Sequence, residues 1–118
     1  MWLCGTRTKL SRACALPNGA DPTKLVKNLC ANYDADELRF SATARVPLGA
    51  QIMGSEPWLL ELAARHLATE KSAPRIDLNC GCPANVVTGK GAGSSLLRDP
   101  EYVYACVKAV ADGARGSS

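Results

Sequence analysis

The sequence predicts an α/β fold built from parallel strands that are joined by helices. Segments with helical periodicity begin near residues 21, 55 and 99, and short apolar segments at 48–53 and 75–80 alternate with them. Strands that alternate with helices in this way pair in parallel, because each helix carries the chain back to the start of the next strand. Only two strong strands are visible, and their edges would stay open, so the sequence indicates part of a larger α/β domain.

The composition is typical of a globular protein and excludes few functions. The chain has 118 residues, 47% hydrophobic and 21% charged, with a formal net charge of +3 at pH 7. This mild positive charge is compatible with RNA binding, but nucleic-acid-binding domains are usually more basic and clustered. No apolar run reaches the roughly 18 residues of a membrane span, and the start lacks the apolar core of a signal peptide. We therefore expect a cytoplasmic protein with reduced thiols.

The first part of the chain contains one predicted helix after an irregular start. Residues 1–19 show no periodic pattern, and we expect them to be irregular or disordered. Asp21 and Pro22 form a strong helix start, because Asp caps helices and Pro fits the first helical position. The polar stretch at 34–45 is predicted as a loop. One apolar face follows the helix start: Leu25, Val26, Leu29, Cys30 and Tyr33.

The two predicted strands frame the second helix. Residues 48–53 form a buried strand, "LGAQIM", and Ser55 or Glu56 opens a helix with Pro57 in its first turn. Leucine and alanine side chains recur at helical spacing along one side of this helix. The second strand, "RIDLNC", covers residues 75–80.

The last part of the chain is helical again. A glycine-rich loop follows the second strand and leads to a short helix at 93–97, and Asp99-Pro100 repeats the helix start seen at Asp21. Gly113 suits the C-cap of the final helix. The inner face of that helix is predicted from its spacing: Val103, Cys106, Val107 and Val110. We therefore divide the chain into an irregular segment at 1–19, an α/β unit at 20–113 and a polar tail at 114–118.

The chain has six cysteines, and the closely spaced pair after the second strand is the most informative. Cys30 and Cys106 lie on apolar helix faces and are predicted to be small buried hydrophobic residues. For Cys80 and Cys82, a structural zinc site would need a second ligand pair, which is absent, and a disulfide between them would be strained. We predict no metal site. Cys82 lies just beyond a strand end, where active sites of parallel α/β folds form, but the residues alone leave an inert buried thiol open.

The glycines after this pair do not match a known phosphate-binding pattern. The P-loop pattern fails because Lys90 lies between Gly89 and Gly91. The dinucleotide pattern fails because Ser94 stands where a third glycine is needed. A tight structural turn and a direct ligand contact both remain open for this loop.

The segment "DLNCGCPANVVTGKGAGSSLL", residues 77–97, resembles the signature of the tRNA-dihydrouridine synthases. The resemblance extends outward: "AQIMGSEPWLLELAARHL" is similar to the family's third barrel strand with its helix, and "LLRDPEYVYACVKAVADG" to the helix after the fourth. Together these segments cover about two thirds of the chain. The second cysteine, Cys80, makes the bacterial C-type branch the most similar.

The resemblance implies a partial TIM (β/α)8 barrel of about two βα units from a flavin enzyme. Such an enzyme uses FMN, with NADPH as reductant, to reduce uridine in tRNA to 5,6-dihydrouridine. Cys82 matches the family's proton donor, whereas Cys80 is implied to be packing or local support. Asn79 matches a residue that contacts the substrate base, and Gln51 matches the glutamine that binds the flavin ring. Lys90, inside the glycine-rich loop, is the leading candidate for a tRNA contact, with basic residues elsewhere as weaker ones.

Several parts of the family pattern have no counterpart in this sequence. These parts are the first barrel strand, the flavin-binding lysine, the flavin-phosphate loops and the helical RNA-binding domain. We therefore expect an incomplete and inactive fragment of such an enzyme. The alternative is a non-catalytic α/β fragment that associates through exposed strand edges, including with copies of itself. Arg75 and Arg98 are further basic candidates for the tRNA backbone.

Overall fold

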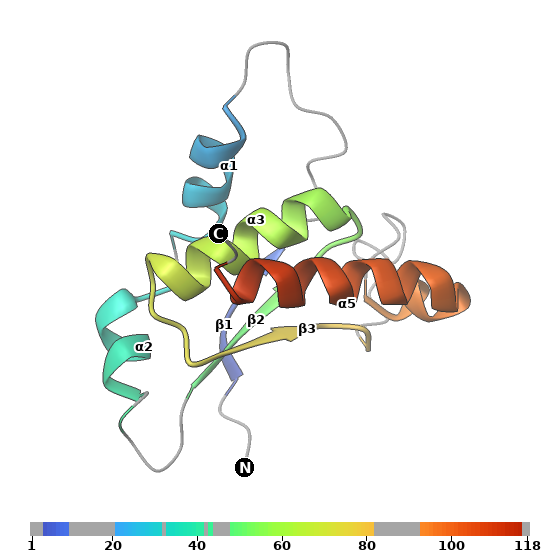
Figure 1. Ribbon diagram of the computed structural model, residues 1–118. Helices are drawn as coiled ribbons and strands as arrows, with labels where there is room; N and C mark the ends of the chain where they lie inside the picture. Colours follow the sequence, from blue (N-terminus) through green and yellow to red (C-terminus); the bar gives the residue numbers. More distant parts are fainter. Residues whose placement is uncertain are drawn as a thin grey trace.

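A three-stranded parallel sheet forms the centre of the computed structural model (Figure 1). The structure describes residues 4–9, 21–31, 33–41, 43, 48–81 and 93–116. The strands follow the order β1 (Cys4–Lys9), β2 (Gly49–Met53) and β3 (Arg75–Leu78), so β2 is central. The predicted parallel α/β arrangement is confirmed, and its assignment to a partial TIM barrel stays a prediction.

The strand β1 corrects the prediction that residues 1–19 are irregular. It pairs in parallel with β2, with Arg7 opposite Gln51 and a shift of register between Cys4 and Arg7. Strand propensity depends strongly on the neighbours that a segment finds, so a short segment without apolar alternation gives little signal by itself. Residues 1–3 and 10–19 lie outside the described residues.

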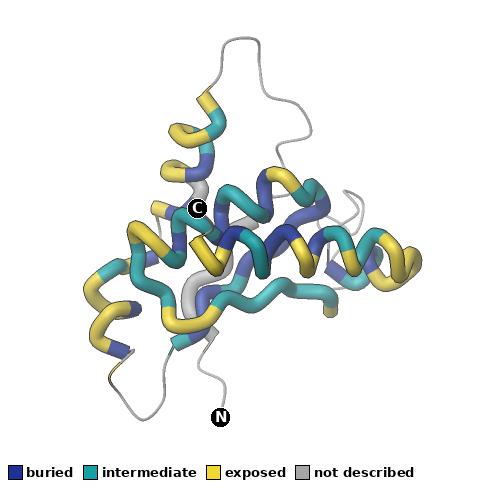
Figure 2. Tube along the Cα trace, viewed as in Figure 1, coloured by how far each residue is buried: buried dark blue, intermediate teal, exposed yellow. Residues whose placement is uncertain are grey.

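Helices α3 (Pro57–Thr69) and α5 (Pro100–Ala114) pack on one face of the sheet (Figure 1). The two helices also pack against each other. Buried residues of both helices and of the strands belong to one core, and Figure 2 marks the buried positions along the chain in dark blue. Because successive side chains of a strand point to opposite faces, Gln51 and Asp77 share the face away from this core. The strand residues that contribute to the core are Ala50, Ile52, Ile76 and Leu78.

Two shorter helices precede β2. α1 (Pro22–Leu29) begins as predicted, with the Thr23 N–H donating to Asp21 Oδ1 at 2.9 Å. It ends four residues before Tyr33. α2 (Ala35–Ser41) corrects the predicted loop at 34–45: the N–H groups of Asp36 and Glu37 donate to Asp34 Oδ1 at 2.9 and 3.2 Å. The buried residues of α2 are Leu38 and Ser41.

The short helix and the helix cap before α5 both form where the sequence predicted them. η1 (Gly93–Arg98) is a 3-10 helix, which confirms the predicted short helix, and its Leu96 is buried. Asp99 caps α5, since its Oδ1 accepts from the N–H groups of Glu101 and Tyr102 at 3.1 and 3.3 Å. None of the helices in the described ranges is long and apolar enough to cross a membrane.

Gly113 allows α3 and α5 to approach closely, and it is not the C-cap that the sequence predicted. α5 continues to Ala114, and Arg115 is its C-cap. A Cβ atom on Gly113 would lie 2.2 Å from the carbonyl oxygen of Glu61 and 3.0 Å from the Cβ of Ala64. No side chain fits at such distances, so the helix contact itself requires glycine.

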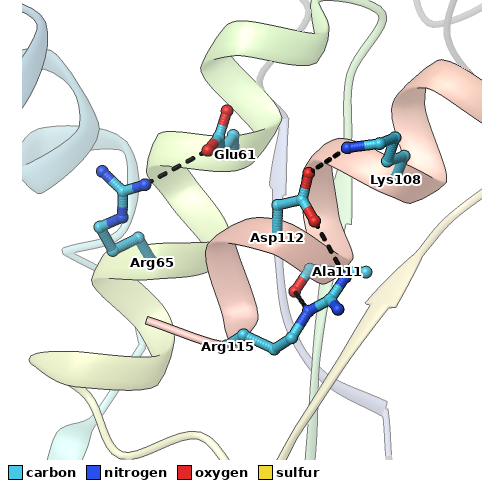
Figure 3. Close-up of polar contacts among 6 residues, drawn as sticks. All are labelled: Glu61, Arg65, Lys108, Ala111, Asp112 and Arg115. Carbon is cyan, nitrogen blue, oxygen red and sulfur yellow. Dashed lines mark hydrogen bonds and ion pairs between the residues drawn. The ribbon is translucent and has the colours of Figure 1, made fainter. Parts of the chain in front are cut away.

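The ion pairs of the two helices lie within each helix and do not join them (Figure 3). Arg65 pairs with Glu61 at 3.2 Å on α3. On α5, Asp112 pairs with Lys108 at 2.7 Å and with Arg115, just beyond the helix, at 2.9 Å. Exposed pairs of this kind contribute little to stability, because solvent and salt screen them. Apolar packing and the Gly113 contact therefore hold the helices together.

We expect Gly113→Ala to lower the free energy of unfolding by about 1–3 kcal/mol, because the added methyl group overpacks a backbone contact. Urea unfolding followed by far-UV circular dichroism measures this loss. Gly81→Ala is the matched control, since a Cβ atom there would meet nothing within 4 Å. Equal losses in the two variants would show that the close helix contact is wrong.

Candidate active site

Two carboxamide side chains, Gln51 and Asn79, meet at the carboxyl ends of β2 and β3. The Asn79 Nδ2 group donates to Gln51 Oε1 at 3.2 Å. The backbone N–H of Asn79 donates to the carbonyl of Ile52 at 2.9 Å, which continues the pairing of the two strands beyond β3. Both amides are half-buried. The sheet therefore brings together two residues that lie 28 positions apart in the chain.

The amide of Gln51 keeps a hydrogen-bond donor available. Its side-chain oxygen accepts from Asn79, whereas its Nε2 group has no partner among the residues that the structure describes. A carboxamide nitrogen carries two N–H donors. The hydrogen bond from Asn79 therefore fixes the oxygen end of the Gln51 amide, and the nitrogen end carries the donors on the face of the sheet away from the core.

Asn79 also directs the chain that leaves the strand. Its Oδ1 atom accepts from the backbone N–H of Gly81 at 3.1 Å, which forms an Asx turn. The next residue is Cys82, which lies outside the described residues together with Lys90, in the segment 82–92. The acid role of Cys82 and the tRNA contact of Lys90 therefore stay predictions.

The backbone conformation explains the third glycine of the loop, Gly93. Its φ is 62°, a left-handed conformation that residues with a side chain rarely adopt, and the residue is buried at the start of η1. For this position the tight turn is the supported interpretation. Gly89 and Gly91 lie outside the described part of the chain.

Two tyrosines hold the end of β2, and the sequence did not reveal this role. The Tyr33 hydroxyl donates to the backbone carbonyl of Gln51, and the Tyr102 hydroxyl of α5 donates to the carbonyl of Ser55. The side chain of Tyr33 is only 2% exposed. A buried tyrosine usually finds a partner for its hydroxyl, so its place on the predicted apolar face was the available signal.

The three thiols that the structure describes are all packed against the core. Cys30 and Cys106 are fully buried, as predicted, and burial raises the pKa of Cys30 to about 11, with a smaller opposing effect of Lys71. Burial also raises the pKa of Cys106 and of Cys80. Cys80 is half-buried beside the core, which supports a packing role. Among the described residues, no three His, Cys, Asp or Glu side chains are grouped to hold a metal ion.

The two weaker candidates for a tRNA backbone contact, Arg75 and Arg98, lie on different elements. Arg75 begins β3, at the end of the strand away from Asn79, and its Nε lies 3.5 Å from Asp77 Oδ1. A contact of Arg75 with the tRNA backbone stays a prediction. Arg98 is exposed at the end of η1.

Comparison with known proteins identifies related sequences. A family model described as dihydrouridine synthase matches residues 23–115, which include Gln51, Asn79, Cys82 and Lys90. The chain is 41% identical over 90 residues to the tRNA-dihydrouridine(16) synthase of Salmonella typhimurium strain LT2, and 42% over 90 residues to that of Pasteurella multocida strain Pm70. It is 38% identical over 94 residues to that of Escherichia coli strain K12. Each match covers 75% of this chain and 27% of the relative.

We expect the chain to lose stability as the pH rises from about 9 to about 11, because of Cys30. The unfolded thiol loses its proton near the usual pKa of 9.0, whereas the folded thiol keeps it until about 11. The contribution of Cys30 is therefore complete below pH 9 and lost as the pH rises through the folded value. Relative to Cys30→Ala, the wild-type chain should lose about 2 kcal/mol of unfolding free energy between about pH 8 and about pH 10.5.

Urea unfolding of both proteins at the two pH values measures this difference. The other ionisable groups are present in both proteins, so the difference between the two pH dependences reports on Cys30 and its immediate charged neighbour Lys71. Parallel pH dependences would contradict the buried, protonated state of Cys30.

Proposed function

Because this chain belongs to the dihydrouridine synthase family, we propose that it carries part of an active site that reduces uridine in tRNA to 5,6-dihydrouridine. The observation that supports this most is the hydrogen-bonded pair of Gln51 and Asn79 at the carboxyl ends of parallel strands. Active sites of barrels built from parallel strands form at that edge. The proposal includes a cytoplasmic location, where tRNA would be the substrate.

Asn79 is proposed to contact the uracil base. The imide edge of uracil offers one N–H donor and two carbonyl acceptors, and a carboxamide supplies both complementary groups. The contacts of Asn79 with Ile52 and Gly81 fix its backbone and side chain before a base arrives. Such fixed positioning lowers the entropic cost of reaching a reactive geometry. The base must leave the RNA stack to reach this edge.

Gln51 is proposed to bind the ring of FMN. Its Nε2 donors have no partner among the described residues, and the held Oε1 keeps them oriented, which fits a ring that carries carbonyl and nitrogen acceptors. A bound FMN, reduced by NADPH, would provide the hydride that C6 of the base receives. The hydrogen bond from the Tyr33 hydroxyl to the backbone carbonyl of Gln51 helps to hold this residue in place.

Cys82 is proposed to supply the proton that C5 of the base needs when C6 receives a hydride. A thiol is mostly protonated at neutral pH, because its ordinary pKa lies well above 7, so it can serve as an acid without a large shift. The Asx turn at Asn79 and Gly81 sets the path of the chain into this residue. Lys90, in the same loop, is proposed to contact tRNA phosphate.

The chain alone is proposed to be an incomplete and inactive enzyme. It spans 27% of the curated relatives that it matches, and within its described residues Gln51 is the one proposed flavin contact. One side chain holds a ligand of this size weakly, because binding must offset the loss of translational and rotational freedom.

We therefore expect no stoichiometric flavin after the purified 118-residue chain is mixed with FMN and passed through gel filtration. The flavin absorbance of the protein peak measures retention. A stoichiometric flavin spectrum in that peak would contradict the incomplete site.

The activity of these residues is testable inside a complete relative. We expect a chimera, in which residues 23–115 replace the matching segment of the Escherichia coli relative, to form dihydrouridine in tRNA. Cys82→Ala should lower the rate by about 100-fold or more, because general acid catalysis contributes on that order. Cys80→Ala is the matched control and should lower it only a few-fold. Nucleoside mass spectrometry of tRNA from a strain without its own enzyme measures the product.

Equal losses for Cys82→Ala and Cys80→Ala would overturn the roles given to the two thiols. A chimera that folds and retains flavin but forms no dihydrouridine would overturn the proposed function.

A further inference from the structure

An open polar pocket lies where α1 meets the last turn of α3 (Figure 1). It has a volume of about 440 Å³. Side chains from α1, from the start of α2, from α3 and from the turn after α3 line it. All of them lie between positions 27 and 71, inside the segment that the family model matches. The pocket is therefore a feature of the contact between α1 and α3 and not of an open sheet edge.

Two lysines give this pocket an excess of positive charge. Lys27 lies in the last turn of α1 and Lys71 in the turn after α3, and neither has an ion-pair partner among the described residues. Glu70 is the one carboxylate that lines the pocket. Asn28 adds a carboxamide, whose nitrogen carries two N–H donors. Positive charge gathered in a hollow attracts anions, so the lining favours an anionic ligand.

The imidazole of His66 lies in the positive field of these lysines. Burial lowers the pKa of His66 and the charge of Lys71 lowers it further, whereas Glu70 opposes them and Lys27 adds to the lowering. The Nε2 atom of His66 is buried, and neither ring nitrogen has a hydrogen-bond partner among the described residues. An anion beside the ring would therefore offset the repulsion that the lysines exert on its charged form.

A smaller pocket of about 220 Å³ shares His66 and Glu70 with the first one. Arg65 lines this smaller pocket, and its Nε atom is buried without a partner, although its Nη2 pairs with Glu61. In the part of the chain that the structure describes, Arg65 Nε and His66 Nε2 are the only buried side-chain nitrogen or oxygen atoms without a partner. Buried polar atoms nearly always have one, so a ligand with acceptor oxygens would gain most at this place.

We propose that the larger pocket binds the phosphate group of a small molecule, with Lys27, Lys71 and His66 as its contacts. A phosphate carries several acceptor oxygens and up to two negative charges, so it can meet both ammonium groups and an imidazole N–H at once. α3 ends at the pocket and the chain then enters the start of β3, so the pocket lies at the opposite end of the sheet from Gln51 and Asn79. The site does not depend on the proposed catalysis.

Nuclear magnetic resonance of His66 tests the proposal on the full chain, because His66 is its one histidine. Inorganic phosphate is the probe, and sodium chloride keeps the ionic strength constant during the titration. The imidazole signal should shift along a saturating curve, which gives the phosphate Kd. Phosphate should also raise the pKa of His66, because a nearby anion favours the charged form of the ring.

Lysine variants test the contacts while His66 remains the reporter. Lys27→Ala and Lys71→Ala should each raise the phosphate Kd at least about tenfold, because each removes a charge-assisted hydrogen bond. Without phosphate, both should raise the pKa of His66, since each removes a charge that lowers it. Lys24→Ala is the matched control, because Lys24 lies one turn earlier on α1 and lines neither pocket. It should leave the Kd close to the wild-type value.

Three outcomes would overturn the proposal. One is a His66 signal that phosphate does not shift, or shifts without saturation at constant ionic strength. Another is a Lys24→Ala variant that loses as much affinity as Lys27→Ala, which would assign the effect to the general charge of the chain. The third is a signal that responds to added tRNA but not to inorganic phosphate, which would assign the pocket to RNA and not to a small molecule.

Discussion

The register between β2 and β3 is the constraint on which the candidate site depends. Gln51 lies opposite Asp77 in that register, and the hydrogen bond from Asn79 to the carbonyl of Ile52 extends it past the end of β3. A slip of one residue would turn every side chain of β3 to the other face. Asn79 would then point toward the helices, and Cys80 would take its place beside Gln51.

Packing on the far side of the sheet fixes this register. The apolar residues of both strands face α3 and α5, and the contact at Gly113 lets these two helices form a close pair above them. The hydroxyls of Tyr33 and Tyr102 bind backbone carbonyls at and just beyond the end of β2. The amide pair is therefore held in place by the packing of the strands against the helices and by hydrogen bonds to the backbone of β2.

The sequence predicted what local chemistry decides and missed what distant contacts decide. The helix starts at Asp21 and Asp99 follow from capping, and both are confirmed. Gly113 was wrongly predicted as a helix cap. Glycine is needed there because a Cβ atom would lie 2.2 Å from the carbonyl oxygen of Glu61. Glu61 belongs to a helix about 50 residues earlier in the chain, so the local sequence does not reveal this contact. Each amide was recognisable at a strand end, but only the folded sheet shows that they bond to each other. The role of Cys82 rests on family resemblance.

A double-mutant cycle on Gln51 and Asn79 tests the central claim, that the two amides work as one hydrogen-bonded unit. The measurement is the rate of dihydrouridine formation by chimeras that carry Gln51→Ala, Asn79→Ala or both. Residues in contact show coupled effects, whereas independent residues show additive ones. The account predicts that the double variant loses clearly less activity than the product of the two single losses. Losses that multiply fully would contradict a paired site.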